Sequence, residues 1–460
     1  MTAAVQQAID ALRGQFGSRL SVGAAVREQH GRGEAYTQGF PPDAVIWPQS
    51  TSEVSAIMRT CHELRVPVIA YGAGTSLEGH VSAPRGGICI DMSRMDLVIA
   101  VHAEDADCVV QPGVTREALN TYLRDTGLFF PVDPGANATL GGMISTRASG
   151  TTTVRYGTIA HNVLALELVL ANGDIVRCGS RARKSSAGYD LVRLITGAEG
   201  TLGIITEATL RLHGQPEAVG SAVCSFSELR GAVEAVIELI QSGAPLARIE
   251  FLDDVQVRAC NAYSKLSLRE QPTLFIEFHG TASSVAEQFE RAGEVVRSHG
   301  ATSFDWASDE QRRGQLWRAR HAAYFAALGL RPGCECVVAD VCVPISSLAE
   351  CVAATRREID AAGLIAPIVG HVGDGNFHVL FLLEPGNAEE RERMERVYDA
   401  MIEHAHRLDG TCTGEHGIGL GKRDKLVAEF GETVVALMRR LKEAWDPHDI
   451  LNPGKVFHTT

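Results

Sequence analysis

Two histidines stand close together in the segment IVGHVGDGNFHVLFLL, residues 368–383. Two apolar runs flank a Gly-Asp-Gly-Asn turn, and each run carries one histidine beside that turn. This pattern predicts a β-hairpin in which Val372 faces Phe377 and His371 faces His378. Directly opposed residues of a strand pair bring their Cβ atoms to roughly 4.5–5.5 Å. Two imidazoles at that distance could share one metal ion.

A catalytic metal site needs a third protein ligand besides an open coordination position. The best candidate downstream is Glu415 in GTCTGEHGIGLGKRDK, where the neighbouring glycines free the backbone to turn Glu415 and His416 inward. Two imidazoles and a carboxylate suit Zn²⁺, Mn²⁺ or Fe²⁺. A single histidine is as well explained by a hydrogen-bonded core or turn position. The pair together with the Glu-His dipeptide predicts a metal site with His371, His378 and Glu415 as ligands.

The bulk composition describes a globular protein of more than one domain. The chain has 460 residues, of which 45% are hydrophobic, 22% are charged and 46 are glycine. A chain of this length divides into two or three domains as a rule. The formal net charge of −13 argues against a nucleic-acid partner, because phosphate binding needs a positive surface.

Eleven scattered cysteines without any C-x-x-C pair indicate neither a disulfide framework nor a cysteine zinc cluster. They predict reduced thiols in a cytoplasmic protein, with a peripheral position at the inner membrane left open. The amino terminus, MTAAVQQAIDALRGQFG, is typical of an amphipathic helix and not of a signal peptide. No run of eighteen apolar residues occurs, so we expect no transmembrane segment.

Residues 38–213 alternate short apolar segments with glycine-rich turns, which predicts strands at VPVIAYG, GICIDMS, CVVQPG, LALELVLANG, GDIVRCG and GIITEATLRL. A helix is expected over TSEVSAIMRTCHELR, capped by Thr51 or Ser52. Too few long helices occur for a doubly wound sheet, so the fold class is α+β. After residue 213, strands such as TLFIEFHG alternate with long helices, which predicts a mixed sheet covered by helices on one face. The last helix is expected to end at Trp445, before DPHDILNPGK.

Three glycine-rich loops lie in the first half of the chain. The first is YGAGTSLEG, the second lies within PVDPGANATLGGMISTRASGTTTVRYGT, and the third is GAEGTLGII. Glycines let the backbone approach a ligand closely, and successive N–H groups can form an anion-binding nest. The first loop has neither the Rossmann spacing nor a Walker lysine, and taken singly each loop is an ordinary connector. Their coincidence in one strand-rich region predicts a long polar cofactor wrapped by backbone.

These loops, in this order and nearly continuous from Phe40 to Leu212, resemble the FAD-binding domain of the vanillyl-alcohol oxidase/p-cresol methylhydroxylase (PCMH) flavoproteins. The whole chain, including DPHDILNPGK, is similar to the group that contains cytochrome-type D-lactate dehydrogenase, the glycolate oxidase FAD subunit and D-2-hydroxyglutarate dehydrogenase. The resemblance implies a two-subdomain FAD-binding domain and a mixed-sheet α+β substrate (cap) domain. The expected parts are an N-terminal helical segment 1–37, the FAD-binding domain 38–215, the substrate domain 216–410 and a C-terminal segment 411–460 that completes the active site.

The resemblance also implies which residues contact FAD. They are Tyr71, Gly72, Ala73, Gly74, Thr75, Ser76, Gly79, Pro134, Gly135, Thr139, Gly141, Gly142, Ser145, Ser149, Gly150, Thr151, Gly200, Gly203, Ile205 and Asn452. Relatives with covalent FAD often carry a histidine inside the first loop, where this chain has Thr75, so noncovalent FAD is expected. His80 and His161 remain conceivable attachment points. His161 stands where the family has an aspartate, in YGT-x-x-D-N-V.

For the substrate site, the resemblance assigns His371, His378 and Glu415 to a divalent metal, either Zn²⁺ or Mn²⁺. It assigns His416 as the general base and brings Asn376 to the substrate. A substrate carboxylate needs a guanidinium partner, and LWRARHAAYFAAL offers two arginines that could face inward. Of these, the W-x-x-R context resembles the family's substrate arginine and favours Arg320 over Arg318.

The expected reaction is the oxidation of a D-2-hydroxy acid to a 2-oxo acid with hydride transfer to the flavin N5. The hydroxyglutarate branch has a lysine before its D-x-x-x-P segment, where this chain has Val338 and Ala339 ahead of Asp340. A monocarboxylate such as D-lactate therefore fits better than a dicarboxylate. Alternatives are a D-2-hydroxyglutarate dehydrogenase, a glycolate oxidase subunit, a metal-dependent hydrolase and a flavin-binding subunit without catalysis. The electron acceptor could be cytochrome c, a quinone, an electron-transfer flavoprotein or an iron–sulfur partner, and the chain could form a homodimer.

Overall fold

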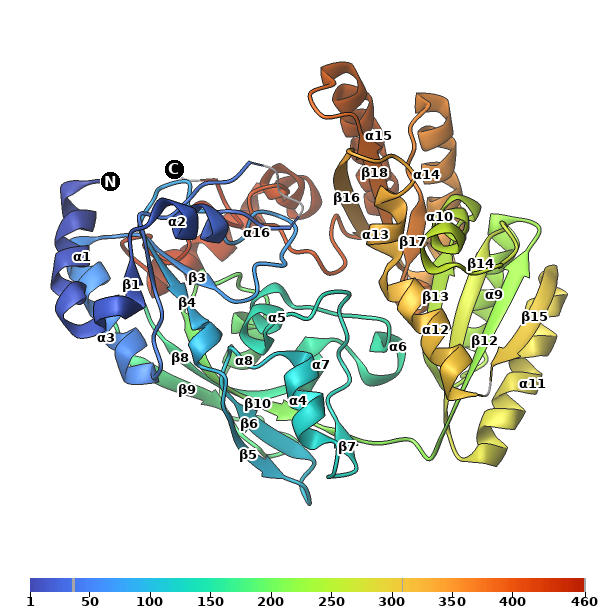
Figure 1. The fold of residues 1–460 in the computed structure, drawn as a ribbon, viewed down its shortest axis with the longest axis horizontal. Coiled ribbons are helices and arrows are strands. Elements are labelled where there is room, and N and C mark those ends of the chain that lie inside the picture. Colours follow the sequence, from blue (N-terminus) through green and yellow to red (C-terminus); the bar gives the residue numbers. More distant parts are fainter. Residues whose placement is uncertain (35–37, 308, 459–460) are drawn as a thin grey trace. The chain divides into compact units, whose positions relative to one another are not determined.

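A computed structural model describes residues 1–34, 38–307 and 309–458 of the chain (Figure 1). The chain forms two compact units, each described here by itself. Unit 1 comprises Met1–Ser149, Gly157–Gln215 and Glu415–Thr460, and unit 2 comprises Gly150–Tyr156 and Pro216–Gly414. The expected segments 1–37 and 38–215 therefore lie in unit 1 except for residues 150–156, and the expected C-terminal segment passes from unit 2 to unit 1 at Gly414. Residues 35–37 and 459–460 lie outside the described residues.

Unit 1 contains three sheets. A four-stranded sheet has the order β1-β2-β4-β3, a five-stranded sheet the order β5-β6-β10-β8-β9, and β11 pairs with β7. The strands are β1 (Leu20–Ser21), β2 (Ala44–Ile46), β3 (Val68–Tyr71), β4 (Ile88–Asp91), β5 (Val98–His102), β6 (Asp107–Val110), β7 (Leu128–Phe129), β8 (Val163–Val169), β9 (Ile175–Gly179), β10 (Ile204–Arg211) and β11 (His213–Gly214). The five-stranded sheet is antiparallel throughout, whereas β2, β4 and β3 run parallel.

The helices of unit 1 cover these sheets. They are α1 (Ala3–Phe16), α2 (Ala24–His30), α3 (Thr51–Leu64), α4 (Arg116–Leu123), α5 (Leu140–Thr146), α7 (Ile159–Asn162), α8 (Leu191–Ile195) and α16 (Arg423–Trp445), with 3-10 turns at Gly17–Arg19 and Met92–Arg94. The expected amphipathic first helix is confirmed, because Ile9 and Leu12 of α1 belong to the same buried core as β2, β3 and α3. Within α16, Gly431 has φ 74° and ψ 161°, so the helical course is interrupted there.

The carboxyl terminus returns to the four-stranded sheet. Val68 of β3 donates its N–H to the Ile450 carbonyl at 2.7 Å and accepts the N–H of Asn452 at 2.8 Å. The DPHDILNPGK segment thereby extends the sheet beyond β3 by one short parallel bridge. This pairing brings Asn452 to the glycine loop that follows β3.

Unit 2 is built on a single sheet of seven strands in the order β15-β12-β14-β13-β17-β18-β16. Its strands are β12 (Ala218–Phe226), β13 (Leu246–Leu252), β14 (Thr273–Gly280), β15 (Ala301–Ala307), β16 (Glu335–Cys342), β17 (Ile368–Gly370) and β18 (Asn376–Leu383). Its helices are α6 (Thr153–Tyr156), α9 (Leu229–Gln241), α10 (Asp254–Ser264), α11 (Ala282–Ser298), α12 (Glu310–His321), α13 (Ala323–Leu328), α14 (Leu348–Ala362) and α15 (Ala388–Arg407), with 3-10 turns at Ile345–Ser347 and Val372–Asp374.

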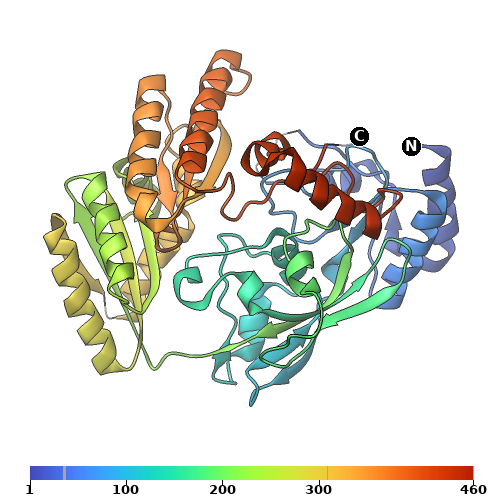
Figure 2. The same ribbon diagram turned by 180° about the vertical axis from the view of Figure 1, so that it is seen from behind.

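Helices cover both faces of this sheet, not one face as expected. Figure 2 shows the face that carries α9, α11, α14 and α15, and Figure 1 shows α10, α12 and α13 on the other. Phe275 of β14 and Trp317 of α12 belong to the buried core on the second face. The sheet is also antiparallel in every pairing, where a mixed sheet was expected. Strands with apolar side chains on both faces require a cover on each side, which the apolar runs already implied.

The predicted α+β class and the predicted strands of both halves are confirmed. The helix cap was predicted one or two residues too late, because the Ser50 hydroxyl accepts the Glu53 N–H at 3.3 Å and α3 begins at Thr51. No disulfide bond joins any cysteines in the described ranges. None of the helices in those ranges has both the length and the apolar character that crossing a bilayer requires.

Candidate active site

His371 and His378 lie side by side in unit 2, but not as the directly opposed pair that the sequence predicts. His378 is opposite Val369, and His371 lies one residue beyond the end of β17 at Gly370. The carbonyl of His371 accepts the N–H groups of both Asp374 and Asn376, at 3.0 and 3.3 Å. These bonds close a 3-10 turn that is longer than the expected hairpin turn. The two rings nevertheless lie with their centroids 5.4 Å apart at an interplanar angle of 82°.

Each of these histidines has a buried carboxylate beside it. His371 Nδ1 lies 2.8 Å from Glu250 Oε1, and His378 Nδ1 lies 3.4 Å from Asp340 Oδ1. Glu250 and Asp340 are almost completely buried. A carboxylate at one ring nitrogen fixes the ring and directs the other nitrogen outward, as in histidines that bind metals. The donor set of unit 2 therefore fits a divalent metal ion.

Asp340 also orders the residues around His378. Its carboxylate accepts hydrogen bonds from Asn376 Nδ2 at 2.6 Å, from Thr413 Oγ1 at 2.8 Å and from the Gly414 N–H at 2.8 Å. The Asn376 side-chain amide donates its second N–H to the Val341 carbonyl at 2.8 Å. Its Oδ1 is buried and has no hydrogen-bond partner within the described residues. This oxygen is an acceptor that a bound ligand could satisfy.

The two arginines of α12 that the sequence offers differ in burial. Arg320 is 8% exposed and forms an ion pair with Glu250 through its Nη2, whereas Arg318 is exposed. The Nε of Arg320 is buried and has no hydrogen-bond partner among the described residues. Glu250 thus connects Arg320 to His371 in one cluster. The predicted substrate arginine thus belongs to the same buried cluster as His371.

Further charged residues on the same sheet were not predicted. Arg248 lies 3.2 Å from Glu277, and the same carboxylate lies 2.9 Å from His279 Nε2. His279 Nδ1 in turn lies 2.8 Å from the hydroxyl of Tyr156 on α6. The signal was present in the sequence, since two charges two residues apart in an apolar strand, as in ARIEFLD and TLFIEFHG, share one face of the sheet.

Glu415 and His416 open the last segment of unit 1. The hydroxyl of Ser149 donates a hydrogen bond to Glu415, and His416 Nε2 lies 3.9 Å from Glu415 Oε1. Both side chains are partly buried. Glu415 follows directly on Gly414, whose N–H is bonded to Asp340 in unit 2. The segment Gly414 to Gly419, here named the GEHGIG loop, thus begins at the Asp340 carboxylate.

Unit 1 brings the three glycine loops together. A Cβ on Gly72 of the first loop would lie 2.2 Å from Thr139 Oγ1 of the second, so Gly72 is required for this contact. The N–H of Glu199 in the third loop donates to the Ser145 carbonyl at 2.8 Å. Asn452 Nδ2 donates to the Glu199 carbonyl at 2.7 Å.

The other predicted FAD residues lie in the same unit, except for two. Tyr71 ends β3, Pro134 and Gly135 precede α5, Gly141 and Gly142 lie in its first turns, and Ser149 follows it. Gly200 and Gly203 precede β10, and Ile205 lies within that strand. Gly150 and Thr151 belong to unit 2. The backbone N–H groups of Ala73 to Leu77 have no acceptor within the described residues, and the Ser76 hydroxyl is buried without a partner there. A row of free amides after a strand fits a pyrophosphate, so these residues fit FAD.

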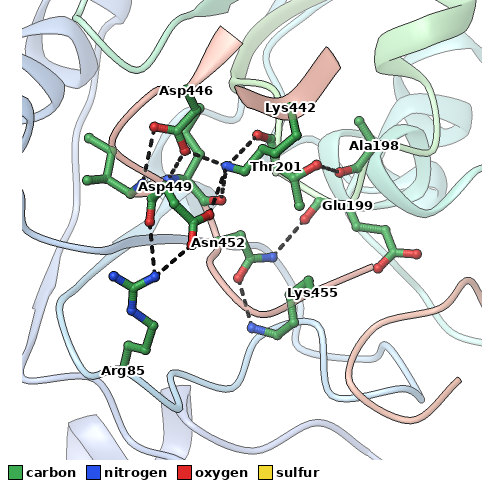
Figure 3. Close-up of polar contacts among 11 residues, drawn as sticks. Arg85, Ala198, Glu199, Thr201, Lys442, Asp446, Asp449, Asn452 and Lys455 are labelled. Carbon is green, nitrogen blue, oxygen red and sulfur yellow. Dashed lines mark hydrogen bonds and ion pairs between the residues drawn. The ribbon is translucent and has the colours of Figure 1, made fainter. Parts of the chain in front are cut away.

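Several residues that hold these loops were missed. His80 Nε2 lies 3.2 Å from Glu199, and Lys455 donates to Asn452 Oδ1 at 2.9 Å and to the Ser82 carbonyl at 2.6 Å. Figure 3 shows Asn452 between Glu199 and Lys455. No spacing rule marks these contacts, because the partners are more than a hundred residues apart or belong to irregular loops. His161 caps α7, its Nδ1 accepting the Thr158 N–H at 3.1 Å, as an aspartate would.

The C-terminal segment is fixed by a buried ion pair. Lys442 Nζ contacts Asp446 and donates to the carbonyls of Thr201 at 3.0 Å and Leu451 at 2.9 Å (Figure 3). Asp446 accepts the N–H groups of Ile450 and Leu451 at 3.1 and 2.7 Å. These hydrogen bonds fix the backbone between the end of α16 and Asn452.

Two family models match the chain, one for each part. Residues 42–179 match the FAD binding domain, and residues 215–456 match the C-terminal domain of FAD linked oxidases. The chain is 51% identical over 463 aligned residues to a Danio rerio protein named "Probable D-lactate dehydrogenase, mitochondrial", covering 100% of this chain and 93% of that protein. It is 46% identical over 415 residues to the Arabidopsis thaliana protein named "D-lactate dehydrogenase (cytochrome), mitochondrial", covering 90% of this chain and 73% of the relative.

Among solved structures, p-cresol methylhydroxylase with substrate bound has a TM-score of 0.80 at 18% identity, covering 100% of this chain and 98% of that chain. At this identity the likeness concerns the fold alone. It confirms the PCMH-type architecture expected from the three glycine loops. The loops, the fit to FAD and the two family models together identify the chain as an FAD-dependent oxidoreductase that belongs to the family of FAD-linked oxidases.

Proposed function

We propose that this protein oxidises D-2-hydroxy acids to 2-oxo acids and that D-lactate is the substrate to try first. The observation that carries the proposal is the cluster in unit 2, where one buried carboxylate, Glu250, contacts both Arg320 and His371. A carboxylate-binding guanidinium beside an imidazole pair is what a 2-hydroxy acid requires. The names of the two relatives, at 51% and 46% identity, support the same chemistry.

We also propose a divalent metal, Zn²⁺ or Mn²⁺, with His371, His378 and Glu415 as its ligands. The carboxylates beside both imidazoles support this choice, as does the Gly414 N–H bonded to Asp340 one residue before Glu415. When bound, the metal supplies a Lewis acid that makes the substrate hydroxyl more acidic.

The protein's own groups then have distinct tasks. Arg320 binds the substrate carboxylate, for which its partnerless Nε is suited. Asn376 Oδ1 accepts a hydrogen bond from the substrate, since its two N–H groups are already used. His416 accepts the hydroxyl proton at a ring nitrogen. FAD, held noncovalently, supplies the acceptor for the hydride that leaves C2.

A short monocarboxylate suits the cluster better than a dicarboxylate. A second carboxylate would need another cation, and Val338 and Ala339 stand where the hydroxyglutarate branch has a lysine. Arg248, on the same strand as Glu250, is paired with Glu277 at 3.2 Å. For the electron acceptor we propose a cytochrome, because the Arabidopsis relative carries cytochrome in its name.

The test is an anaerobic absorption spectrum of the purified holoprotein during addition of D-lactate, L-lactate, glycolate and D-2-hydroxyglutarate in turn. The expected result is bleaching of the flavin band by D-lactate, with little effect of L-lactate. A chelator should abolish the bleaching, and Zn²⁺ or Mn²⁺ should restore it. A flavin band that no hydroxy acid bleaches would reject the proposed substrate class. Bleaching that withstands complete metal removal would reject the metal.

A further inference from the structure

The carboxylate of Glu199 binds the turn that directly follows His416. Its Oε1 accepts the Ile418 N–H at 2.7 Å, and its Oε2 accepts the Gly419 N–H at 2.8 Å. All of these residues belong to unit 1. A carboxylate that accepts two successive backbone amides fixes the path of that backbone, because charged acceptors form stronger hydrogen bonds than neutral ones. The GEHGIG loop is thereby bonded to Asp340 at its first residue and to Glu199 at its last two.

His80 is the side chain that lies beside the Glu199 carboxylate. Its Nε2 lies 3.2 Å from Glu199 Oε2, and the two side chains are each about 95% buried. A buried carboxylate is costly unless it is paired and hydrogen-bonded. Burial raises the pKa of Glu199, but His80 and the two backbone amides outweigh it, so the pKa lies below its ordinary value. Glu199 is therefore held in its charged form, which is the stronger acceptor.

The backbone at Glu199 supports a role for its side chain. Glu199 has φ 53°, in the left-handed region, and lies between Gly197 and Gly200, which also have positive φ. A residue other than glycine costs on the order of 1 kcal/mol in this conformation. Glycine would remove that strain, yet the chain has glutamate here. The contacts of the carboxylate offset the strain.

Gly417, the residue after His416, packs directly on Glu199 and His80. A Cβ on Gly417 would lie 2.7 Å from Glu199 Oε1 and 2.9 Å from His80 Nε2. The turn also bonds to the first glycine loop, where the Leu420 N–H donates to the Glu78 carbonyl at 2.7 Å. Glu199 and His80 thus leave no room for a side chain at Gly417.

We propose that Glu199, paired with His80, is a positioning residue that fixes the GEHGIG loop and with it the direction of the His416 ring. This inference rests on the proposed function for the role of His416. It adds to that function a buried pair that acts through the backbone of the loop. A shift of about 1 Å in a reacting group can lower a rate by roughly 100-fold, so loss of the carboxylate should act on the rate of the chemical step.

The test compares Glu199→Gln with wild type, with Glu207→Gln as the matched control. Glu207 is another glutamate of unit 1, and its Oε1 lies 3.8 Å from Arg177 Nη2. Hydrogen–deuterium exchange of peptides that contain Ile418 and Gly419 reports the two amides directly and needs no turnover. Anaerobic stopped-flow reduction of the flavin by D-lactate gives the rate of the chemical step, and absorbance gives the FAD content.

The expected result is faster exchange at the two amides in Glu199→Gln and a saturating reduction rate lowered by about 10-fold to 100-fold, with FAD retained. The Glu207→Gln control should match wild type in both measurements. Unchanged exchange in Glu199→Gln would overturn the inference, and so would faster exchange with an unchanged rate. If Glu199→Gln does not fold, His80→Gln carries the same test with the same two outcomes. A wild type that no hydroxy acid reduces would reject the proposed function, while the exchange measurement would still decide whether Glu199 fixes the loop.

Discussion

His371 Nδ1 lies 2.8 Å from Glu250 Oε1, and this contact determines which ring nitrogen is left for a ligand. Replacing a carboxylate that orients a metal-binding histidine lowers metal affinity by about 10-fold to 100-fold in other proteins. We expect Glu250→Gln to do the same here, because the amide is a weaker acceptor and the ring loses its fixed orientation. The measurement is a titration of metal content against a competing chelator.

The control for this prediction is Glu238→Gln. Glu238 lies 2.7 Å from His299 at the surface of the same unit, so the control removes a similar glutamate–histidine contact away from the site. Its metal affinity should equal that of wild type. Equal affinities for Glu250→Gln and wild type would show that the His371 contact has no part in metal binding.

The two arginines of α12 give a second matched pair. Arg320 is buried beside Glu250, whereas Arg318 on the same helix is exposed. A hydrogen bond to a charged group contributes about 1.5–3 kcal/mol, so Arg320→Met should lower kcat/KM for D-lactate by roughly 10-fold to 150-fold. Arg318→Met should stay within twofold of wild type. Steady-state kinetics with an artificial electron acceptor measures both, and similar losses in the two variants would remove the distinction on which the substrate assignment rests.

The third prediction concerns Asp340 and the free energy of unfolding. Three donors point at its carboxylate, namely Asn376 Nδ2, Thr413 Oγ1 and the Gly414 N–H. Asparagine would keep one acceptor and present an N–H group to the remaining donors. Leaving a buried donor unsatisfied costs about 1–3 kcal/mol, and we expect Asp340→Asn to lower the free energy of unfolding by that amount in urea denaturation.

Asp360→Asn is the comparison for Asp340. Asp360 is exposed and pairs with Arg356 at 2.6 Å, and surface ion pairs contribute about 0–1 kcal/mol. Its free energy of unfolding should lie near that of wild type. If Asp340→Asn lowered the free energy of unfolding no more than Asp360→Asn does, water would have to replace the missing acceptor.

Much of the fold could be predicted from local sequence patterns. The apolar runs bounded by glycine gave the strands of both units, and the three glycine loops indicated the cofactor region. The register of the histidine pair could not be predicted from local patterns. The two rings do lie side by side, but the predicted register was wrong, since the His371 carbonyl accepts two N–H groups and closes a longer turn. Such a choice depends on turn hydrogen bonds that the alternation of apolar residues does not encode.

The residues that support the site could not be predicted in the same way. Glu199 and His80 are 119 positions apart, and neither lies in a periodic element. Asp340 was noted only as the start of the D-x-x-x-P segment, although its carboxylate lies beside His378 and accepts a hydrogen bond from Asn376. Long-range polar contacts of this kind depend on the tertiary arrangement, so a single sequence gives no signal for them. Charged residues two positions apart in an apolar strand, as at Arg248 and Glu250, are the one pattern that marks such a face.

A fourth prediction concerns the first glycine loop. A Cβ on Gly72 would lie 2.2 Å from Thr139 Oγ1, so Gly72→Ala forces the first and second loops apart. We expect the variant to lose FAD during gel filtration, while its far-ultraviolet circular dichroism stays close to that of wild type. Gly14→Ala is the control, because nothing lies within 4 Å of a Cβ there and α1 should gain roughly 0.5–1 kcal/mol. Full FAD content in Gly72→Ala would mean that the loop contact does not shape the cofactor site.

The last prediction concerns pH. Burial lowers the pKa of Lys455 to about 7 from its ordinary value of 10.5, while the amine donates to Asn452 and to the Ser82 carbonyl. Between pH 7 and 10 the folded protein therefore binds fewer protons at this group than the unfolded chain does. Stability rises with pH wherever the unfolded state binds more protons, so the contribution of Lys455 to stability should increase across this window.

The measurement is the difference in Tm between wild type and Lys455→Met, taken by calorimetry at intervals from pH 7 to 9.5. The difference should move in favour of wild type as the pH rises, because the neutral amine keeps its hydrogen bonds without the cost of a buried charge. Lys184→Met, at an exposed position, should give a difference that does not change with pH. A pH-independent difference for Lys455→Met would mean that Lys455 keeps its charge in the folded protein, with its ammonium compensated by the nearby Glu199 carboxylate.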